Sequence, residues 1–97
     1  MISEEEYEML KALDDKWMWI ARDDKESYES PYSNRVMAYQ KRPNKHNGLS
    51  IWSNGCGGMY LTEDLFQFIQ WEDEEPYSIA ELIEEYESGV NRSEERY

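Results

Sequence analysis

Carboxylates are the residues of this sequence with the clearest chemical potential, and they are concentrated in its last third. From Glu63 to Gly89 there are ten acids and no lysine or arginine. Like charges at helical spacing destabilise a helix, so these acids gain nothing from one another. Spacings of three to four residues correspond to about 4.5–6 Å along a helix, which is comparable to the charge spacing of a nucleic-acid strand. The pattern therefore favours a row of carboxylates that occupies a groove built for phosphates.

The candidate partner contacts are acids of this segment together with two tyrosines that can anchor the rim of an interface. They are Glu72, Asp73, Glu74, Glu75, Tyr77, Glu81, Glu84, Glu85 and Tyr86. We expect these carboxylates to accept charge-assisted hydrogen bonds from arginines and lysines of a basic partner. An alternative stays open, in which the same acids are a solvated face that keeps a small protein soluble.

Catalytic and metal-binding constellations have little support. His46 is the only histidine, which excludes metal sites that need two. Cys56 and His46 could in principle form a nucleophile and its base, but a tight turn explains the glycines around Cys56. Residues 72–75 lack the alternating spacing and central glycine of a calcium-binding loop. We therefore expect no enzyme activity, no cofactor and no metal.

The middle of the chain has the opposite charge, because no acid occurs between Ser30 and Thr62. Four bases and two aromatic residues there could form a small nucleic-acid platform: Arg35, Tyr39, Lys41, Arg42, Lys45 and Trp52. The favoured interpretation is that these bases balance the field of the acidic segments. With a net charge of −12, the protein repels phosphate backbones and anionic membranes. We expect neither of them to be a direct partner.

The length and composition predict one folded domain. Ninety-seven residues are close to the common domain size, and an aromatic content of 14 % distinguishes the chain from disordered acidic chains. One cysteine excludes an internal disulfide. The sequence begins without a signal-peptide pattern, and no apolar run approaches the roughly 20 residues of a membrane span. We expect a cytoplasmic protein, with residues 1–90 as a single α+β domain and 91–97 as a flexible tail.

The start of the chain predicts a helix over about residues 4–13. Ser3 and Glu6 have the spacing of a capping box, and Ile2 can pack against Tyr7 as a hydrophobic staple. Strand-forming segments follow at 16–22, 35–41, 49–52 and 57–61, with a turn over 43–48. We expect them to form an antiparallel sheet of three to four strands, over about residues 16–61, with a meander as the simplest topology.

Two helices are expected after this sheet. Thr62 is a candidate helix start, with Leu65, Phe66 and Ile69 on one face of the helix. A second capping box pairs Ser78 with Glu81, and Gly89 can terminate the helix that follows it. The predicted fold is thus α+β, with the sheet flanked by an N-terminal helix and two C-terminal helices.

Three segments of the sequence resemble small uncharacterised proteins of Gram-positive bacteriophages and prophages. They are residues 19–23, residues 39–43 and residues 64–79, in which the run from Leu65 to Pro76 is the most distinctive. The resemblance covers about residues 5–81 and implies a phage setting without assigned catalytic residues. In size, charge and setting the chain is also similar to acidic anti-CRISPR proteins that mimic DNA.

This resemblance implies a phage-encoded anti-defence inhibitor in the cytoplasm of an infected bacterium. Its partner would be a basic nucleic-acid-binding host protein whose DNA binding it blocks, and a type II CRISPR effector nuclease is the candidate that we favour. An alternative of another class is a non-catalytic phage accessory or regulatory protein. That protein would bind a partner through its aromatic sheet, at residues such as Trp17, Tyr39 and Trp52.

Overall fold

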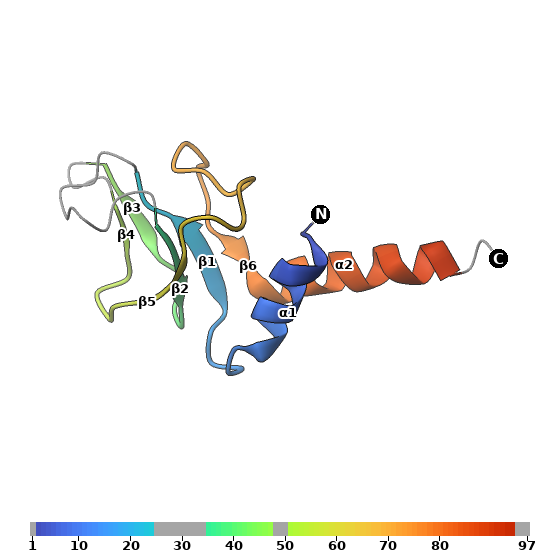
Figure 1. Cartoon of the computed structure of the whole chain (residues 1–97). Helices are drawn as coiled ribbons and strands as arrows, with labels where there is room; N and C mark the ends of the chain where they lie inside the picture. Colours follow the sequence, from blue (N-terminus) through green and yellow to red (C-terminus); the bar gives the residue numbers. More distant parts are fainter. Residues whose placement is uncertain (1, 25–34, 48–50, 95–97) are drawn as a thin grey trace.

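The protein combines antiparallel sheets with two helices (Figure 1). The computed structural model describes residues 2–24, 35–47 and 51–94. The main sheet has four strands in the order β5-β2-β1-β6, and β3 and β4 form a separate two-stranded sheet. The elements in chain order are α1 (Glu4–Ala12), β1 (Trp19–Arg22), β2 (Val36–Tyr39), β3 (Asn44–His46), β4 (Ile51–Ser53), β5 (Met59–Thr62), β6 (Tyr77–Ser78) and α2 (Ile79–Glu94). The predicted α+β class with an antiparallel sheet is confirmed.

Helix α1 begins as its sequence predicts. The Ser3 side chain accepts a hydrogen bond from the Glu6 amide at 3.1 Å, and the Glu6 carboxylate accepts one from the Ser3 amide at 2.8 Å. This reciprocal pair satisfies two backbone donors at the helix start. Ile2 and Leu10 are buried in the core that α1 shares with α2 and the sheet.

Both faces of the main sheet are covered, which explains why every residue of β2 is buried. Successive side chains of a strand point to opposite faces. Ile20, Val36 and Ala38 accordingly join the core beneath the helices. Met37 and Tyr39 join a second cluster with Trp52 of β4. The sheet therefore separates two apolar clusters, one on the side of the helices and one on the side of β3 and β4.

The strand connectivity differs from the expected meander. Residues 44–46 form β3, where a turn is predicted, and β3 pairs with β4 outside the main sheet. Strand β5 pairs with β2 instead. Trp52 accounts for the position of the hairpin, because its amide donates to the buried Asp23 carboxylate at 2.9 Å and its indole donates to the Arg22 carbonyl at 3.1 Å. Side-chain hydrogen bonds thus hold this hairpin over the sheet.

The first of the two predicted C-terminal helices is absent from the described residues, and residues 63–76 form irregular turns instead. Arg22, only 4 % exposed, donates four hydrogen bonds to carbonyls of this segment. The acceptors are the carbonyls of Glu63, Leu65, Phe66 and Ile69, at 2.7–3.2 Å. Carbonyls that point at one guanidinium cannot all lie along a helix axis. The buried arginine therefore replaces the helical hydrogen bonds of the segment.

Helix α2 starts where the second capping box predicts, because the Ser78 side chain accepts from the Glu81 amide at 3.3 Å. It does not end at Gly89 but continues to Glu94. Residues 91–94, which the sequence places in a tail, are therefore helical, and 95–97 lie outside the described residues. A glycine inside a helix costs only about 1 kcal/mol, so it does not have to terminate one. Neither helix of the described part has the length and apolar character needed to cross a membrane.

Candidate partner-binding site

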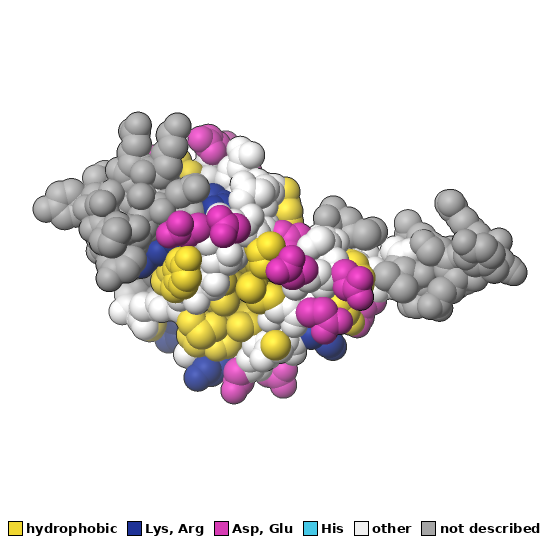
Figure 2. Space-filling view, viewed as in Figure 1, with side chains coloured by type: hydrophobic (Ala, Val, Ile, Leu, Met, Phe, Trp, Pro, Cys, Tyr) yellow, Lys and Arg dark blue, Asp and Glu magenta, His cyan; other side chains and the backbone are white. Residues whose placement is uncertain are grey.

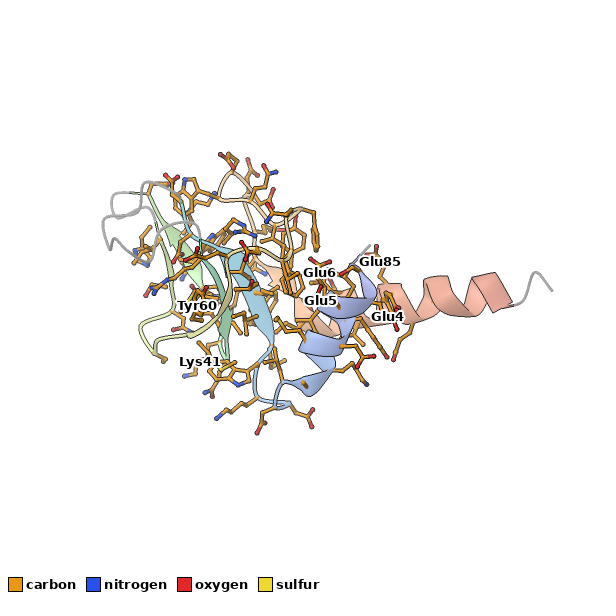
Figure 3. The ribbon with its side chains drawn as sticks, viewed as in Figure 1. Glu4, Glu5, Glu6, Lys41, Tyr60 and Glu85 are labelled. Carbon is orange, nitrogen blue, oxygen red and sulfur yellow. The ribbon has the colours of Figure 1, made fainter. Side chains whose placement is uncertain are left out.

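Helices α1 and α2 pack against each other through an aromatic contact (Figure 1). The rings of Tyr7 in α1 and Tyr86 in α2 are stacked, with centroids 4.3 Å apart and planes inclined by 21°. The Tyr7 hydroxyl also donates to the Glu87 carboxylate at 2.7 Å. Figure 3 shows Glu4, Glu5 and Glu6 of α1 and Glu85 of α2 at this contact, with Tyr60 on β5 and Lys41 in the bend after β2. The fold therefore brings the acidic first turn of α1 and the acids of α2, far apart in sequence, side by side, and we call these residues the acidic side. In Figure 2 the carboxylates of this region lie among hydrophobic and basic side chains.

An open groove lies beside this contact, where the loop over residues 73–76 meets β6 and the first turns of α2. Its volume is about 840 Å³. Its walls consist of acidic, aromatic and apolar side chains, and Arg42 is the single base among the described residues that line it. The lining residues are Trp19, Arg42, Phe68, Asp73, Glu74, Glu75, Pro76, Tyr77, Ser78, Glu81, Leu82 and Glu85. Five carboxylates thus converge on a concave surface.

Aromatic rings provide the apolar part of the groove. Phe68 is 38 % exposed, and its ring packs edge-on against Tyr77, with centroids 5.5 Å apart and planes at 88°. Trp19 lines the groove from the neighbouring strand β1. Ring faces beside carboxylates are suited to organic cations, because the faces of aromatic rings carry negative partial charge.

The side chain of Arg42 illustrates this chemistry within the protein itself. Its guanidinium carbon lies 5.1 Å from the centroid of the Trp19 ring. One of its nitrogens is 3.6 Å from a carboxylate oxygen of Glu75. A guanidinium is thus held between an aromatic ring and a carboxylate at the groove, although both partners of the ion pair remain largely exposed to solvent.

Asp73 has a structural role in the loop that forms one wall. One oxygen of its carboxylate accepts from the Gln70 amide at 3.0 Å and from the Tyr77 hydroxyl at 2.9 Å. Burial raises the pKa of Tyr77, and the hydrogen bond to Asp73 raises it further. Asp73 therefore fixes the loop, while Glu74 and Glu75 of the same loop are exposed.

Six of the nine candidate contacts from the sequence line the groove: Asp73, Glu74, Glu75, Tyr77, Glu81 and Glu85. Glu72 and Glu84 are exposed outside it. Helical geometry explains the division within α2, because residues four apart lie on the same side of a helix. Glu81 and Glu85 are therefore neighbours along the groove, whereas Glu84, which is turned by about 100° from Glu85 around the helix axis, does not line it. Tyr86 packs on Tyr7 and is not part of the groove.

Six groove residues are not among the contacts that the sequence predicts for a basic partner, and three of them carry a ring or a charge: Trp19, Arg42 and Phe68. They come from β1, from the segment after β2 and from the irregular loop. Long-range packing alone brings them together. The sequence gives no local signal that α1 lies beside α2 or that Tyr7 stacks on Tyr86.

The other candidates of the sequence occupy different environments. Cys56 is exposed, and the glycines on either side of it have positive φ angles of 78° and 80°, as a tight turn requires. His46 is exposed on β3. The described residues contain no group of three or more histidine, cysteine, aspartate or glutamate side chains that could hold a metal ion.

The aromatic residues of the basic middle segment belong to the core. Tyr39 is 2 % exposed and Trp52 is 4 % exposed, and burial raises the pKa of the Tyr39 hydroxyl. Arg35 binds the Asp23 carboxylate at 3.2 Å. The Lys45 ammonium lies 4.5 Å from the centroid of Trp71. A nucleic-acid platform or an aromatic binding sheet built on Tyr39 and Trp52 would require rings that this fold buries.

Comparisons with known proteins place no constraint on the function. The chain matches no known family model, no curated protein and no solved structure.

Proposed function

We propose that this protein is a non-catalytic binding module that engages a basic nucleic-acid-binding protein through its acidic side and blocks DNA binding by that protein. The observation that carries the proposal is the convergence of five carboxylates on one groove, next to the contact between α1 and α2. A concave acidic surface raises the local concentration of cationic groups and speeds their encounter with it. It repels phosphate, so the partner is a protein surface that binds nucleic acid.

The carboxylates of α2 support the idea of phosphate mimicry. Glu81, Glu84 and Glu85 are exposed on a regular helix, so their separations are fixed by the backbone. Residues four apart are separated by about 6 Å along the axis. Arginines and lysines of a partner protein that bind successive phosphates can therefore bind these carboxylates instead, in the partner's nucleic-acid groove.

The finer form of the proposal is a phage-encoded anti-defence inhibitor that acts in the cytoplasm of an infected bacterium. Its partner would be a type II CRISPR effector, which reads a short duplex motif with arginines in a positively charged channel. An acidic groove is complementary in charge to such a channel. The support for this form is the resemblance to phage proteins together with the charge of the site.

A competition experiment tests the proposal. The binding of a guide-loaded type II effector to a labelled target duplex is measured with increasing amounts of this protein. We expect the wild-type protein to inhibit binding and the inhibition to weaken as salt screens the charges. The triple variant Glu81→Lys, Glu84→Lys, Glu85→Lys should lose inhibition. The triple variant Glu8→Lys, Asp14→Lys, Asp15→Lys changes the net charge equally at exposed positions elsewhere and should retain it.

The outcomes separate the two levels of the proposal. Equal inhibition by both triple variants would show that these glutamates of α2 are not the contact. If the effector is unaffected, the same assay with other basic DNA-binding proteins decides whether the general function survives. Failure with all of them would refute it.

A further inference from the structure

We propose that the groove is a recognition site for an arginine in an extended basic segment of the partner protein, which takes the place of Arg42. This inference rests on the proposed function and deepens it, because it names the chemical group that is recognised. Phosphate mimicry by a helix requires only an exposed row of carboxylates. An arginine site requires, in addition, a ring, a carboxylate and room for a side chain in one place.

The position of Arg42 is the first observation behind this inference. Its guanidinium lies against Trp19 and beside Glu75, at 5.1 Å and 3.6 Å. The groove therefore already binds the group that it is proposed to recognise. The interaction is weak, because the side chain of Arg42 is 49 % exposed and that of Glu75 is 79 % exposed, and exposed ion pairs contribute little. A guanidinium with more partners can displace it.

The second observation is that the groove holds carboxylates without a ligand of their own. Within the described residues, no hydrogen bond or ion pair engages the carboxylate of Glu74 or Glu81, and both line the groove. Phe68 is exposed nearby and is held edge-on by Tyr77. An incoming guanidinium that displaces Arg42 can thus stack on a ring and donate hydrogen bonds to two carboxylates, whereas Arg42 pairs with one.

The size and lining of the groove define the class of occupant. A volume of about 840 Å³ lies within the range of sites that hold ligands larger than a single side chain. The converging carboxylates exclude nucleic acid and anionic lipid. Arginine is favoured over lysine because a planar guanidinium stacks on aromatic rings and pairs with carboxylates through two bonds. The occupant is therefore a short protein segment rich in arginine.

The first test measures the affinity of a labelled hexa-arginine peptide by fluorescence anisotropy, with a hexa-lysine peptide of equal charge for comparison. We expect the arginine peptide to bind several times more tightly. Glu74→Gln and Glu81→Gln should each weaken its binding by about fivefold, since each removes a charge-assisted hydrogen bond. Glu72→Gln in the same loop and Glu8→Gln in α1 are matched controls at exposed positions outside the groove, and they should change the affinity by less than about twofold, as expected of exposed charges outside the site.

The second test uses Arg42 itself. If Arg42 competes for the site, Arg42→Ala should tighten binding of the arginine peptide by about threefold, the size of effect expected of an exposed ion pair. Lys41→Ala removes the same charge from an exposed neighbour outside the groove and controls for the general field. A gain with Arg42→Ala and none with Lys41→Ala supports displacement. Equal effects of the two variants would overturn it.

The failure of this inference is distinguishable from the failure of the proposed function. If all four glutamine variants weaken the peptide equally, the acidic field is diffuse and the arginine site is refuted, while competition with DNA can still hold. The same conclusion follows if no peptide binds but the intact effector is inhibited. If the wild-type protein neither binds the arginine peptide nor inhibits DNA binding by any basic partner, both proposals are refuted.

Discussion

Two arginines on either side of the main sheet show how burial decides the role of one side-chain type. Arg22 is 4 % exposed and donates four hydrogen bonds to backbone carbonyls. Arg42 is exposed, rests on Trp19 and pairs with Glu75. The first guanidinium determines the path of the loop over residues 63–76, and the second occupies a groove that the end of this loop helps to form. One arginine is required by the fold, and the other can be replaced.

The largest effect is expected for Arg22→Ala. It leaves four carbonyls without their donor in a buried site, and removing one side of a buried charged network costs about 3–5 kcal/mol. Domains of this size have a free energy of unfolding of about 5–15 kcal/mol, so urea denaturation should reveal a severe loss. Arg22→Lys keeps a charge without the planar fork of donors and should recover part of it. A loss below about 1 kcal/mol would mean that other contacts hold the loop.

A second variant tests the other anchor of the same loop. The Glu6 carboxylate accepts hydrogen bonds from the amides of Ser3 and Phe66. Glu6→Ala removes both bonds and should lower the free energy of unfolding by about 1–2 kcal/mol. Glu5→Ala changes the same charge in the same helical turn, at an exposed position, and should cost less than about 0.5 kcal/mol. Equal losses would show that only helix charge matters.

The contacts of Arg22 and Glu6 show which parts of the fold can be predicted from the sequence and which cannot. The capping box at Ser3 and the side-chain cap at Ser78 are local, since donor and acceptor are three residues apart, and both helix starts are predicted correctly. The helix expected after Thr62 is wrong because its helical pattern is overridden by Arg22, which is more than 40 residues away in sequence. Phe66 also has a positive φ of 58°. This backbone conformation is uncommon for a residue other than glycine, and a phenylalanine in the sequence does not predict it.

The same distinction between local and long-range signals applies to the candidate site. The acids and Tyr77 are visible in the sequence because they form one dense run. The groove becomes a possible arginine site only when Trp19, Phe68 and Arg42 are added, and these come from three separate elements. Composition identifies a charged segment, whereas the fold determines which charges share a concave surface.

The exposed hydrogen bond between Tyr7 and Glu87 gives a pH-dependent test of the helix contact. This bond is the main cause that raises the pKa of Tyr7 to about 12, from an unfolded value of 10.0. Because the folded pKa is the higher one, its contribution is complete below pH 10 and is lost as the pH rises from about 10 to 12. Tyr7→Phe keeps the ring stacked on Tyr86 and should reduce the fall in stability over this range. The free energy of unfolding is measured by urea denaturation at several pH values. If its fall with pH is the same in the variant and the wild type, this hydrogen bond does not cause the fall.

The smallest effect on stability is expected for Arg42→Ala, the counterpart of the change at Arg22. Its ion pair with Glu75 is exposed on both sides, and exposed pairs and exposed cation–π contacts contribute about 0–1 kcal/mol each. Urea denaturation should therefore place this variant close to the wild type. That result makes the variant a clean probe of the groove, because a change in peptide binding could not arise from partial unfolding. A loss as large as that of Arg22→Ala would instead make Arg42 part of the framework, and displacement by a partner would be too costly.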